Sequence, residues 1–152
     1  GLYQLADAEW SESHSLAEAA RAVPHGVICL LSALRFHELT TQLPHQVWML
    51  IGHKKWAPKN PPVSLRIIRA TGDALTAGVE RHTIEQVEVP ITNPAKTVAD
   101  CFKYRSQVGL DVAIEALRDC LRSRRATVDD IWHFAAIDRV QNVMRPYIEA
   151  TV

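Results

Sequence analysis

The chain has no excess of charge, no long apolar run and no signal peptide, and each absence excludes a class of protein. Lys plus Arg equal Asp plus Glu at 17 each in 152 residues, so no net positive field draws the whole molecule to nucleic acid. Binding of phosphate groups would therefore require a local basic patch. No apolar stretch approaches the roughly 18 residues that span a bilayer, and the N-terminus lacks basic and apolar signal regions. We expect a protein that is neither secreted nor inserted in a membrane.

The cysteine content also argues against an extracellular protein. Cys29, Cys101 and Cys120 are odd in number, widely separated and each surrounded by an apolar helical pattern. Such positions suit reduced thiols packed in a core better than a disulfide framework. Cys29 lies near His25 and His37 in the sequence, but its apolar neighbours predict burial and a raised thiol pKa, which disfavours a nucleophile. The cysteines therefore predict a cytoplasmic protein.

Motifs of metal and nucleotide chemistry are missing as well. The seven histidines form no His-x-x-x-His pair and have no Cys-x-x-Cys partner. The sequence has no glycine-rich phosphate loop and no Gly-x-Ser-x-Gly elbow. No predicted strand carries the Glu-x-Lys or Asp-x-Lys pair of a two-carboxylate nuclease. We therefore expect no metal, no cofactor and no catalytic residues, and the chain is predicted not to be an enzyme.

What is present predicts a single α+β domain over residues 1–152, because the length and the 47% hydrophobic content suffice for one core. The expected core is a small mixed or antiparallel sheet of about four strands, flanked by N-terminal helices and a C-terminal helical bundle. The first segment, 1–7, has a strand-like pattern. Helices are predicted at 15–23 and from about 26 to 39, strands at 46–51 and 63–70 with two more within 79–91, and helices after Thr92.

Several local signals sharpen this prediction. The continuous apolar run from Val47 to Ile51 is typical of a central strand covered on both faces. Pro90 cannot donate to a ladder, so its strand is expected to lie at an edge or to end there. Asn93 followed by proline predicts a helix start, and Thr127 with Asp130 has the spacing of a capping box.

Polar residues accompany two apolar helical segments without being needed for packing. Ser32 and His37 lie within or beside the second predicted helix. His37 would either hydrogen-bond the following loop, fixing its entry into the strand, or contact a ligand or partner. Asp100, one turn after Lys96, would form a weak surface pair or, if buried, cap the backbone near Pro44. Both alternatives remain open for each residue.

The loop after the central predicted strand concentrates cations around an aromatic residue. Lys54, Lys55, Trp56 and Lys59 form this candidate contact surface, which we call the basic loop. Its composition suits phosphate contact with base stacking, and it equally suits an anchor at a protein interface. The plainer alternative is a solvated loop whose tryptophan folds back onto the sheet.

Three segments together give a family resemblance. They are Gly1-Leu2-Tyr3, the segment 27–42 (VICLLSALRFHELTTQ) with Pro44 and Val47-Trp48 after it, and the segment 92–102 (TNPAKTVADCF). In this order they resemble the AbiEi-type antitoxin and transcriptional regulator family of type IV toxin–antitoxin systems. The polar positions of the shared motifs are Ser32, His37, Lys96, Thr97 and Asp100. Glu38 stands where the family pattern has glycine, which puts a tight turn at that helix end in doubt.

The resemblance implies a function that the residues alone do not. Members carry an N-terminal winged helix-turn-helix that binds their own operator, followed by an α+β domain, and the toxin that they oppose is a nucleotidyltransferase. The resemblance places residues 1–7 at the end of the wing, so that the DNA-reading helix would lie outside this chain. The leading hypothesis is accordingly a non-catalytic regulatory domain that supports autoregulation and counteracts the toxin, with a homo-oligomer left open.

The rival hypothesis is an enzyme or a small-molecule sensor. It requires a pocket lined by the motif residues Ser32, His37, Lys96 and Asp100 together with Arg69, which would orient an anionic ligand. The two hypotheses differ in a property that coordinates display, because the rival needs these side chains to meet in one cavity.

Overall fold

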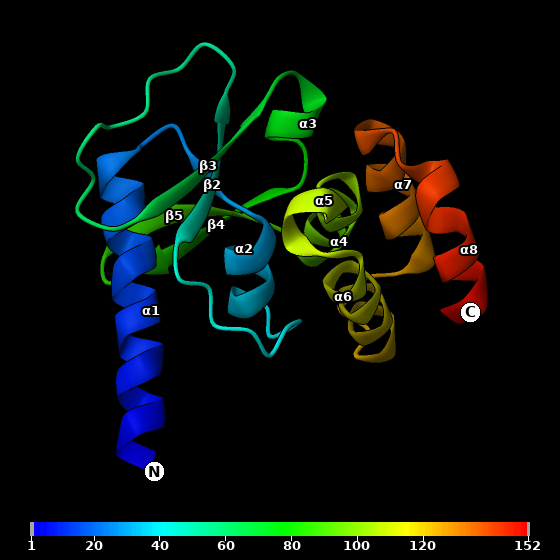
Figure 1. The fold of residues 1–152 in the computed structure, drawn as a ribbon, viewed down its shortest axis with the longest axis horizontal. Helices are drawn as coiled ribbons and strands as arrows, with labels where there is room; N and C mark the ends of the chain where they lie inside the picture. Colours follow the sequence, from blue (N-terminus) through cyan, green and yellow to red (C-terminus); the bar gives the residue numbers. More distant parts are fainter. Residues whose placement is uncertain (1, 152) are drawn as a thin grey trace.

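A computed structural model describes the backbone of residues 2–151 and the side chains from Ser11 onward, and it has the α+β architecture expected from the sequence. The elements in chain order are α1 (Leu2–Ala22), β1 (Val27–Ile28), α2 (Leu30–Phe36), β2 (Val47–Gly52), β3 (Leu65–Ala70), α3 (Asp73–Thr76), β4 (Val79–Ile84), β5 (Val87–Thr92), α4 (Pro94–Lys103), α5 (Arg105–Val108), α6 (Leu110–Arg122), α7 (Val128–Asp138) and α8 (Gln141–Thr151). Figure 1 shows α1 on one side of the sheet and α4 to α8 gathered on the other. Within this described part, no helix has the length and apolar character required to cross a bilayer.

The described residues form one mixed sheet of five strands in the order β3-β2-β1-β5-β4. β1 runs antiparallel to β2 and parallel to β5, β2 runs parallel to β3, and β4 and β5 form an antiparallel hairpin. Two segments far apart in the sequence, β1 and β5, therefore meet at the centre of the sheet. The sheet is mixed, as one of the two expected alternatives, and it has one strand more than expected.

The interior strand β2 divides the core into two layers. Val47, Met49 and Ile51 pack with α1, whereas Trp48 and Leu50 pack with α2 and the C-terminal helices. Alternate side chains of a strand point to opposite faces, so a continuous apolar run is required where both faces are covered. The predicted buried central strand is confirmed.

The N-terminal predictions were wrong. Residues 2–7 belong to the long helix α1 and form no strand, so the helix expected from residue 15 begins at Leu2 instead. Residues 2–10 are rich in Leu, Ala, Gln and Glu, which propagate a helix readily. Leu16, Ala19 and Val23 recur at helical spacing on the face buried against the sheet. The C-terminal half of α1 is therefore packed in the core, and it supports the N-terminal half of the same helix.

The second predicted helix begins later than expected. Val27 and Ile28 form the short central strand β1, and Cys29 is extended with φ −142° and ψ 177° before α2 starts. Short apolar runs fit a buried strand and a buried helix equally well, so periodicity alone could not separate them. Pairing of Val27 with Leu50 and of Ile28 with Ile91 decides for the strand.

The end of α2 is a tight turn despite the glutamate in the glycine position. Glu38 has φ +61°, its N–H donates to Arg35 O at 3.2 Å, and the Leu39 N–H donates to Leu34 O at 2.8 Å. This pair of bonds is the pattern of a Schellman turn, which usually has glycine at the left-handed position. The doubt that Glu38 placed on a tight turn was therefore unfounded, although a side chain there carries a conformational cost.

Other local predictions of the fold are confirmed, with one exception. The side chain of Asn93 accepts from the Lys96 N–H at 2.8 Å, and Thr127 with Asp130 forms the full capping box. All three cysteines are free and buried, and burial raises the pKa of each thiol. The exception is Pro90, because β5 is paired on both sides. The proline is tolerated there because β1 is only two residues long and pairs with Ile91. The short β1–β5 ladder therefore does not need the N–H that Pro90 lacks.

Candidate functional site

The motif residues His37, Thr92 and Thr97 form a buried polar junction where β5 passes into α4. Thr97 Oγ1 lies 2.6 Å from Thr92 Oγ1 and 2.7 Å from the carbonyl oxygen of Asn93, to which it donates. His37 Nε2–H donates to the Thr92 carbonyl at 2.8 Å. Burial lowers the pKa of the His37 imidazole below its ordinary value, with the Thr92 carbonyl opposing that shift. In this junction the neutral imidazole links the end of α2 to the sheet by a hydrogen bond.

The partners of His37 differ from the expected ones. The sequence suggested a hydrogen bond to the loop that follows α2, whereas the imidazole bonds the end of β5, 55 residues away. Arg125 Nη1 donates to the His37 carbonyl at 2.8 Å from the far side. His37 therefore links α2 to the end of β5 and to Arg125, in the segment after α6.

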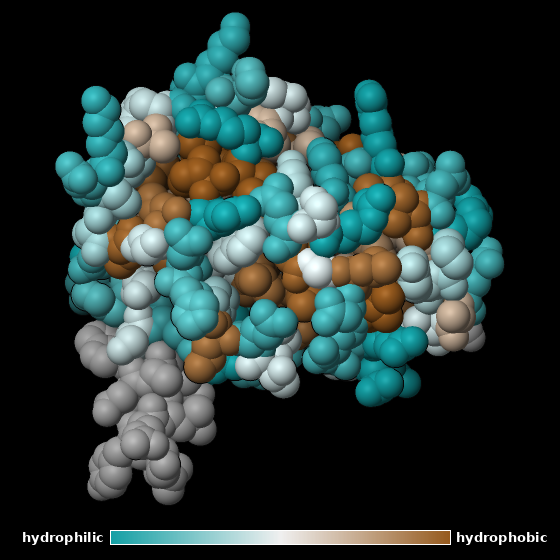
Figure 2. Space-filling model, in the orientation of Figure 1, coloured by the Kyte–Doolittle hydropathy of each residue, from teal (hydrophilic) through white to brown (hydrophobic). Residues whose placement is uncertain are grey.

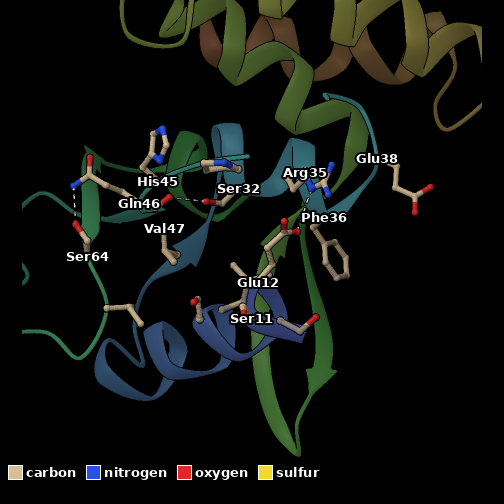
Figure 3. A pocket seen from close by; sticks show the side chains of 15 residues that line it. Ser11, Glu12, Ser32, Arg35, Phe36, Glu38, His45, Gln46, Val47 and Ser64 are labelled. Atoms are coloured by element: carbon tan, nitrogen blue, oxygen red, sulfur yellow. Dashed lines mark hydrogen bonds and ion pairs between the residues drawn. The ribbon is translucent and has the colours of Figure 1, made fainter. Parts of the chain in front are cut away.

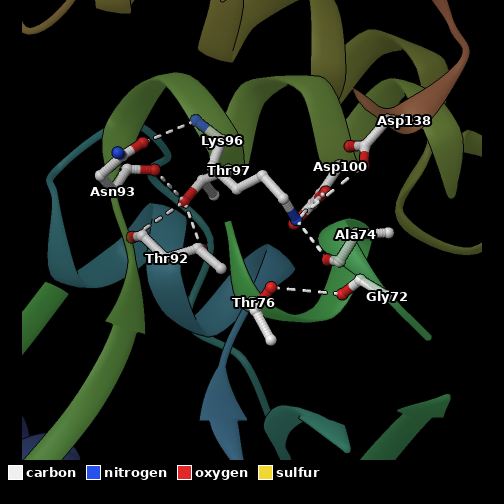
Figure 4. Close-up of polar contacts among 9 residues, drawn as sticks. All are labelled: Gly72, Ala74, Thr76, Thr92, Asn93, Lys96, Thr97, Asp100 and Asp138. Atoms are coloured by element: carbon white, nitrogen blue, oxygen red, sulfur yellow. Dashed lines mark hydrogen bonds and ion pairs between the residues drawn. The ribbon is translucent and has the colours of Figure 1, made fainter. Parts of the chain in front are cut away.

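Lys96, Asp100 and Asp138 form a buried ionic cluster between α4 and α7 (Figure 4). Lys96 Nζ donates to both Asp100 oxygens at 2.7 and 2.8 Å and to the Ala74 carbonyl at 2.9 Å, and Asp138 Oδ1 lies 3.9 Å away. The expected pair of Asp100 with Lys96 does form, but it is buried instead of lying on the surface, and the alternative of a cap on the Pro44 region is wrong. A third ionisable group, Asp138, was not anticipated.

The cluster holds two carboxyl groups and one ammonium without contact with solvent. Burial raises the pKa of Asp100 well above its ordinary value, the neighbouring Asp138 carboxyl adds to the rise, and Lys96 opposes it. No hydrogen bond among the described residues reaches either Asp138 oxygen, and Lys96 Nζ, 3.9 Å from Oδ1, is its ionic neighbour.

Gly78 closes this cluster on the side of the sheet. It has φ +71°, and a Cβ placed there would lie 2.7 Å from Lys96 Cβ and 2.9 Å from a ring carbon of Phe134. The turn before β4 therefore passes against the lysine stem with no room for a side chain. Together with the Ala74 carbonyl, this contact fastens the α3–β4 turn to α4 and α7, which is an architectural role.

The basic loop presents its side chains on a fixed backbone. Lys54, Lys55, Trp56 and Lys59 are all exposed, and Trp56 retains 60% of its accessible surface. Arg69 Nη1 donates to the carbonyls of Gly52 at 3.1 Å, of His53 at 3.3 Å and of Lys55. In Figure 2 hydrophilic side chains project at the end of the molecule where this loop lies.

Trp56 does not fold back onto the sheet, so the plainer alternative for this residue was wrong. His25 Nε2–H donates to the Trp56 carbonyl at 3.0 Å, and the two rings meet edge to face with centroids 5.2 Å apart. His25 thereby holds one edge of the indole while the rest stays accessible. A large aromatic surface beside three ammonium groups can stack on a planar ligand and pair with anionic groups.

A separate cleft of about 870 Å³ opens between α1, α2 and the segments that lead into β2 and β3. Figure 3 shows Ser11 and Glu12 of α1 on one side, with Ser32, Gln46 and Ser64 on the other. Ser32 Oγ accepts from the Trp48 N–H at 2.9 Å, so this hydroxyl both anchors β2 and faces the cleft.

The pocket of the rival hypothesis is not built. Ser32 lines the cleft, but His37, Lys96 and Asp100 are buried in other contacts, and Arg69 is committed to the basic loop. The cleft instead uses Arg35 and Glu12, neither of which the sequence singled out. Among the described residues, no group of three or more His, Cys, Asp or Glu side chains is arranged to hold a metal ion.

No family model matches the sequence, and no curated protein matches it either. The motif residues nevertheless share one property in the structure, because Ser32, His37, Lys96, Thr97 and Asp100 are all buried and all bonded. The accessible polar and aromatic side chains lie elsewhere, in the basic loop and in the cleft.

Proposed function

We propose that this chain is the non-catalytic regulatory domain of an AbiEi-like antitoxin and transcriptional repressor. In this proposal it acts in the cytoplasm, supports autoregulation of its operon and counteracts a nucleotidyltransferase toxin. Recognition of the operator sequence belongs to an N-terminal winged helix-turn-helix outside residues 1–152. The basic loop adds contacts to the DNA backbone, without reading the sequence.

One observation carries the proposal, namely that the basic loop is organised before any partner binds. Arg69 and His25 hold its backbone, while three lysines and most of the Trp56 ring remain exposed. Preorganisation reduces the conformational entropy that binding would otherwise lose. The architectural roles of the buried motif residues support the non-catalytic part of the proposal, because each has a structural partner.

The proposal predicts weak DNA binding by residues 1–152 with a strong dependence on salt. If all three lysines contact duplex phosphates, the affinity falls about 40-fold between roughly 50 and 200 mM salt. Anisotropy titrations of labelled duplex and single-stranded DNA measure this. Trp56→Ala is expected to remove about 1–3 kcal/mol of single-strand affinity where a base stacks on the indole.

Arg118→Ala is the matched control, because Arg118 is an exposed cation on α6, remote from the basic loop in the sequence. It is expected to leave both affinities unchanged. A tight complex of residues 1–152 with duplex DNA that does not respond to salt would refute the assignment of operator reading to another domain. Equal losses from Trp56→Ala and Arg118→Ala would remove the basic loop from the proposal.

A genomic observation tests the part that concerns the toxin. The reading frame adjacent to this one is expected to encode a nucleotidyltransferase, and its expression alone is expected to arrest growth. Co-expression of the antitoxin restores growth if the proposal is right. An unrelated neighbouring frame, or a neighbour whose expression is harmless, would count against it.

A further inference from the structure

We infer that the cleft beside Ser32 is a binding site for a small monoanionic carboxylate with an apolar or aromatic body, and that Arg35 is its anchor. The site is distinct from the basic loop, so the inference goes beyond the proposed function and survives its failure. At about 870 Å³ the cleft lies in the size range of small-molecule sites.

Arg35 is the cation of the cleft and is only partly engaged. Its Nε donates to Glu12 Oε2 at 3.1 Å, and its side chain keeps 26% of its accessible surface. No hydrogen bond among the described residues uses its two terminal Nη groups. A guanidinium binds a carboxylate best through two parallel N–H donors, and this pair is left for a ligand.

The acidic neighbours select the charge of the ligand. Glu12 bonds one edge of the guanidinium, and the exposed Glu38 also lines the cleft. Both carboxylates oppose the binding of any anion, and the repulsion is about twice as large for a dianion such as phosphate as for a monoanion, which still gains the bidentate contact with Arg35. A carboxylate is therefore favoured over a phosphate.

The remaining walls select the body of the ligand. Leu16, Phe36, Val47 and Val63 supply apolar surface, and the ring of Phe36 is only half-buried. Hydroxyl groups of serines stand on both sides of this surface, from α1 and from the segment before β3 (Figure 3). This combination of an apolar floor, a few polar groups and one anchoring charge is typical of a site for a small amphipathic acid.

The test uses benzoate as the probe and benzamide as its neutral counterpart, titrated into residues 1–152 and followed by amide chemical shifts. Benzoate is expected to shift the signals of residues that line the cleft, including Ser32 and Gln46, and benzamide to bind at least about tenfold more weakly. Inorganic phosphate is expected not to displace benzoate. Equal binding of benzamide, displacement by phosphate, or shifts confined to other surfaces would overturn the inference.

Two substitutions with opposite expected effects separate a ligand site from a structural ion pair. Glu12→Gln removes a competing carboxylate and is expected to tighten benzoate binding severalfold, whereas Arg35→Gln is expected to weaken it about tenfold or more. If Arg35→Gln does not fold, Arg35→Lys keeps the charge but loses the fork, and weaker binding than wild type is expected. Arg118→Gln is the control. Unchanged or weaker binding after Glu12→Gln, or unchanged binding after substitution of Arg35, contradicts the inference.

Discussion

Replacement of Lys96 by methionine is the most severe test of the buried cluster. Lys96→Met keeps the length and the apolar stem of the side chain, so the cavity that it creates is small. It removes three hydrogen bonds, two to Asp100 and one to the Ala74 carbonyl, and it leaves the carboxyl groups of Asp100 and Asp138 buried without a cation. Loss of one partner from a buried ion pair costs about 3–5 kcal/mol.

For a domain of this size, that loss corresponds to a fall in Tm of about 6–20 °C. Chemical denaturation followed by circular dichroism measures the free energy of unfolding, and a thermal scan gives the Tm. The double variant Lys96→Met, Asp100→Leu removes both charges of the close pair, and it is expected to recover part of the loss because apolar replacements of whole pairs are often neutral. A cost below about 1 kcal/mol for Lys96→Met would refute the view that the cluster fastens α4 to the α3–β4 turn.

Two further predictions concern the same region. Because the pKa of Asp100 is raised, the folded state holds a proton that the unfolded state releases above about pH 4, so this group lowers the free energy of unfolding as pH rises through that window. Asp138→Asn removes one cause of the raised Asp100 pKa, so the stability of the variant relative to wild type is expected to grow with pH. Denaturation of both proteins at about pH 5 and 8 measures the difference in their free energies of unfolding. A difference that is the same at both pH values would contradict the coupling. Gly78→Ala is expected to cost at least about 2 kcal/mol, because φ is +71° there and the new Cβ would meet Lys96 Cβ at 2.7 Å. Gly72→Ala is the control in the same denaturation assay, because it also has a positive φ, +59°, but nothing lies within 4 Å of a Cβ there. Its cost measures backbone strain without the contact, and equal costs for the two variants would show that the contact with Lys96 is unimportant.

Local signals in the sequence predicted two helix starts, because there the deciding interaction lies within one helical turn. The cap of Asn93 on the Lys96 N–H and the reciprocal bonds of Thr127 and Asp130 are of this kind. The interior position of β2 was also predictable, because its five consecutive apolar residues require burial on both faces of the sheet. The strand at Val27 was not, because only its partners in β2 and β5 distinguish it from a helix.

The candidate site was harder to predict because its contacts join distant segments. Arg125 reaches His37 across 88 residues, Arg35 reaches Glu12 across 23, and nothing in the sequence near Asp138 points to Lys96. The motif residues stand out in the sequence as polar groups in apolar surroundings. Buried residues that hydrogen-bond two elements together have this property, and so do active-site residues. The exposure of the basic loop agrees with its composition, because a cationic, proline-rich segment has little means of burial.

The central proposal is that the basic loop contacts nucleic acid, whereas the motif residues maintain the fold. The variant Lys54→Ala, Lys55→Ala, Lys59→Ala tests it through the slope of log affinity against log salt for duplex DNA, measured together with the Tm. The slope is expected to flatten by about 0.9 for each lysine in contact with phosphate, with an unchanged Tm. An unchanged slope would contradict the proposal.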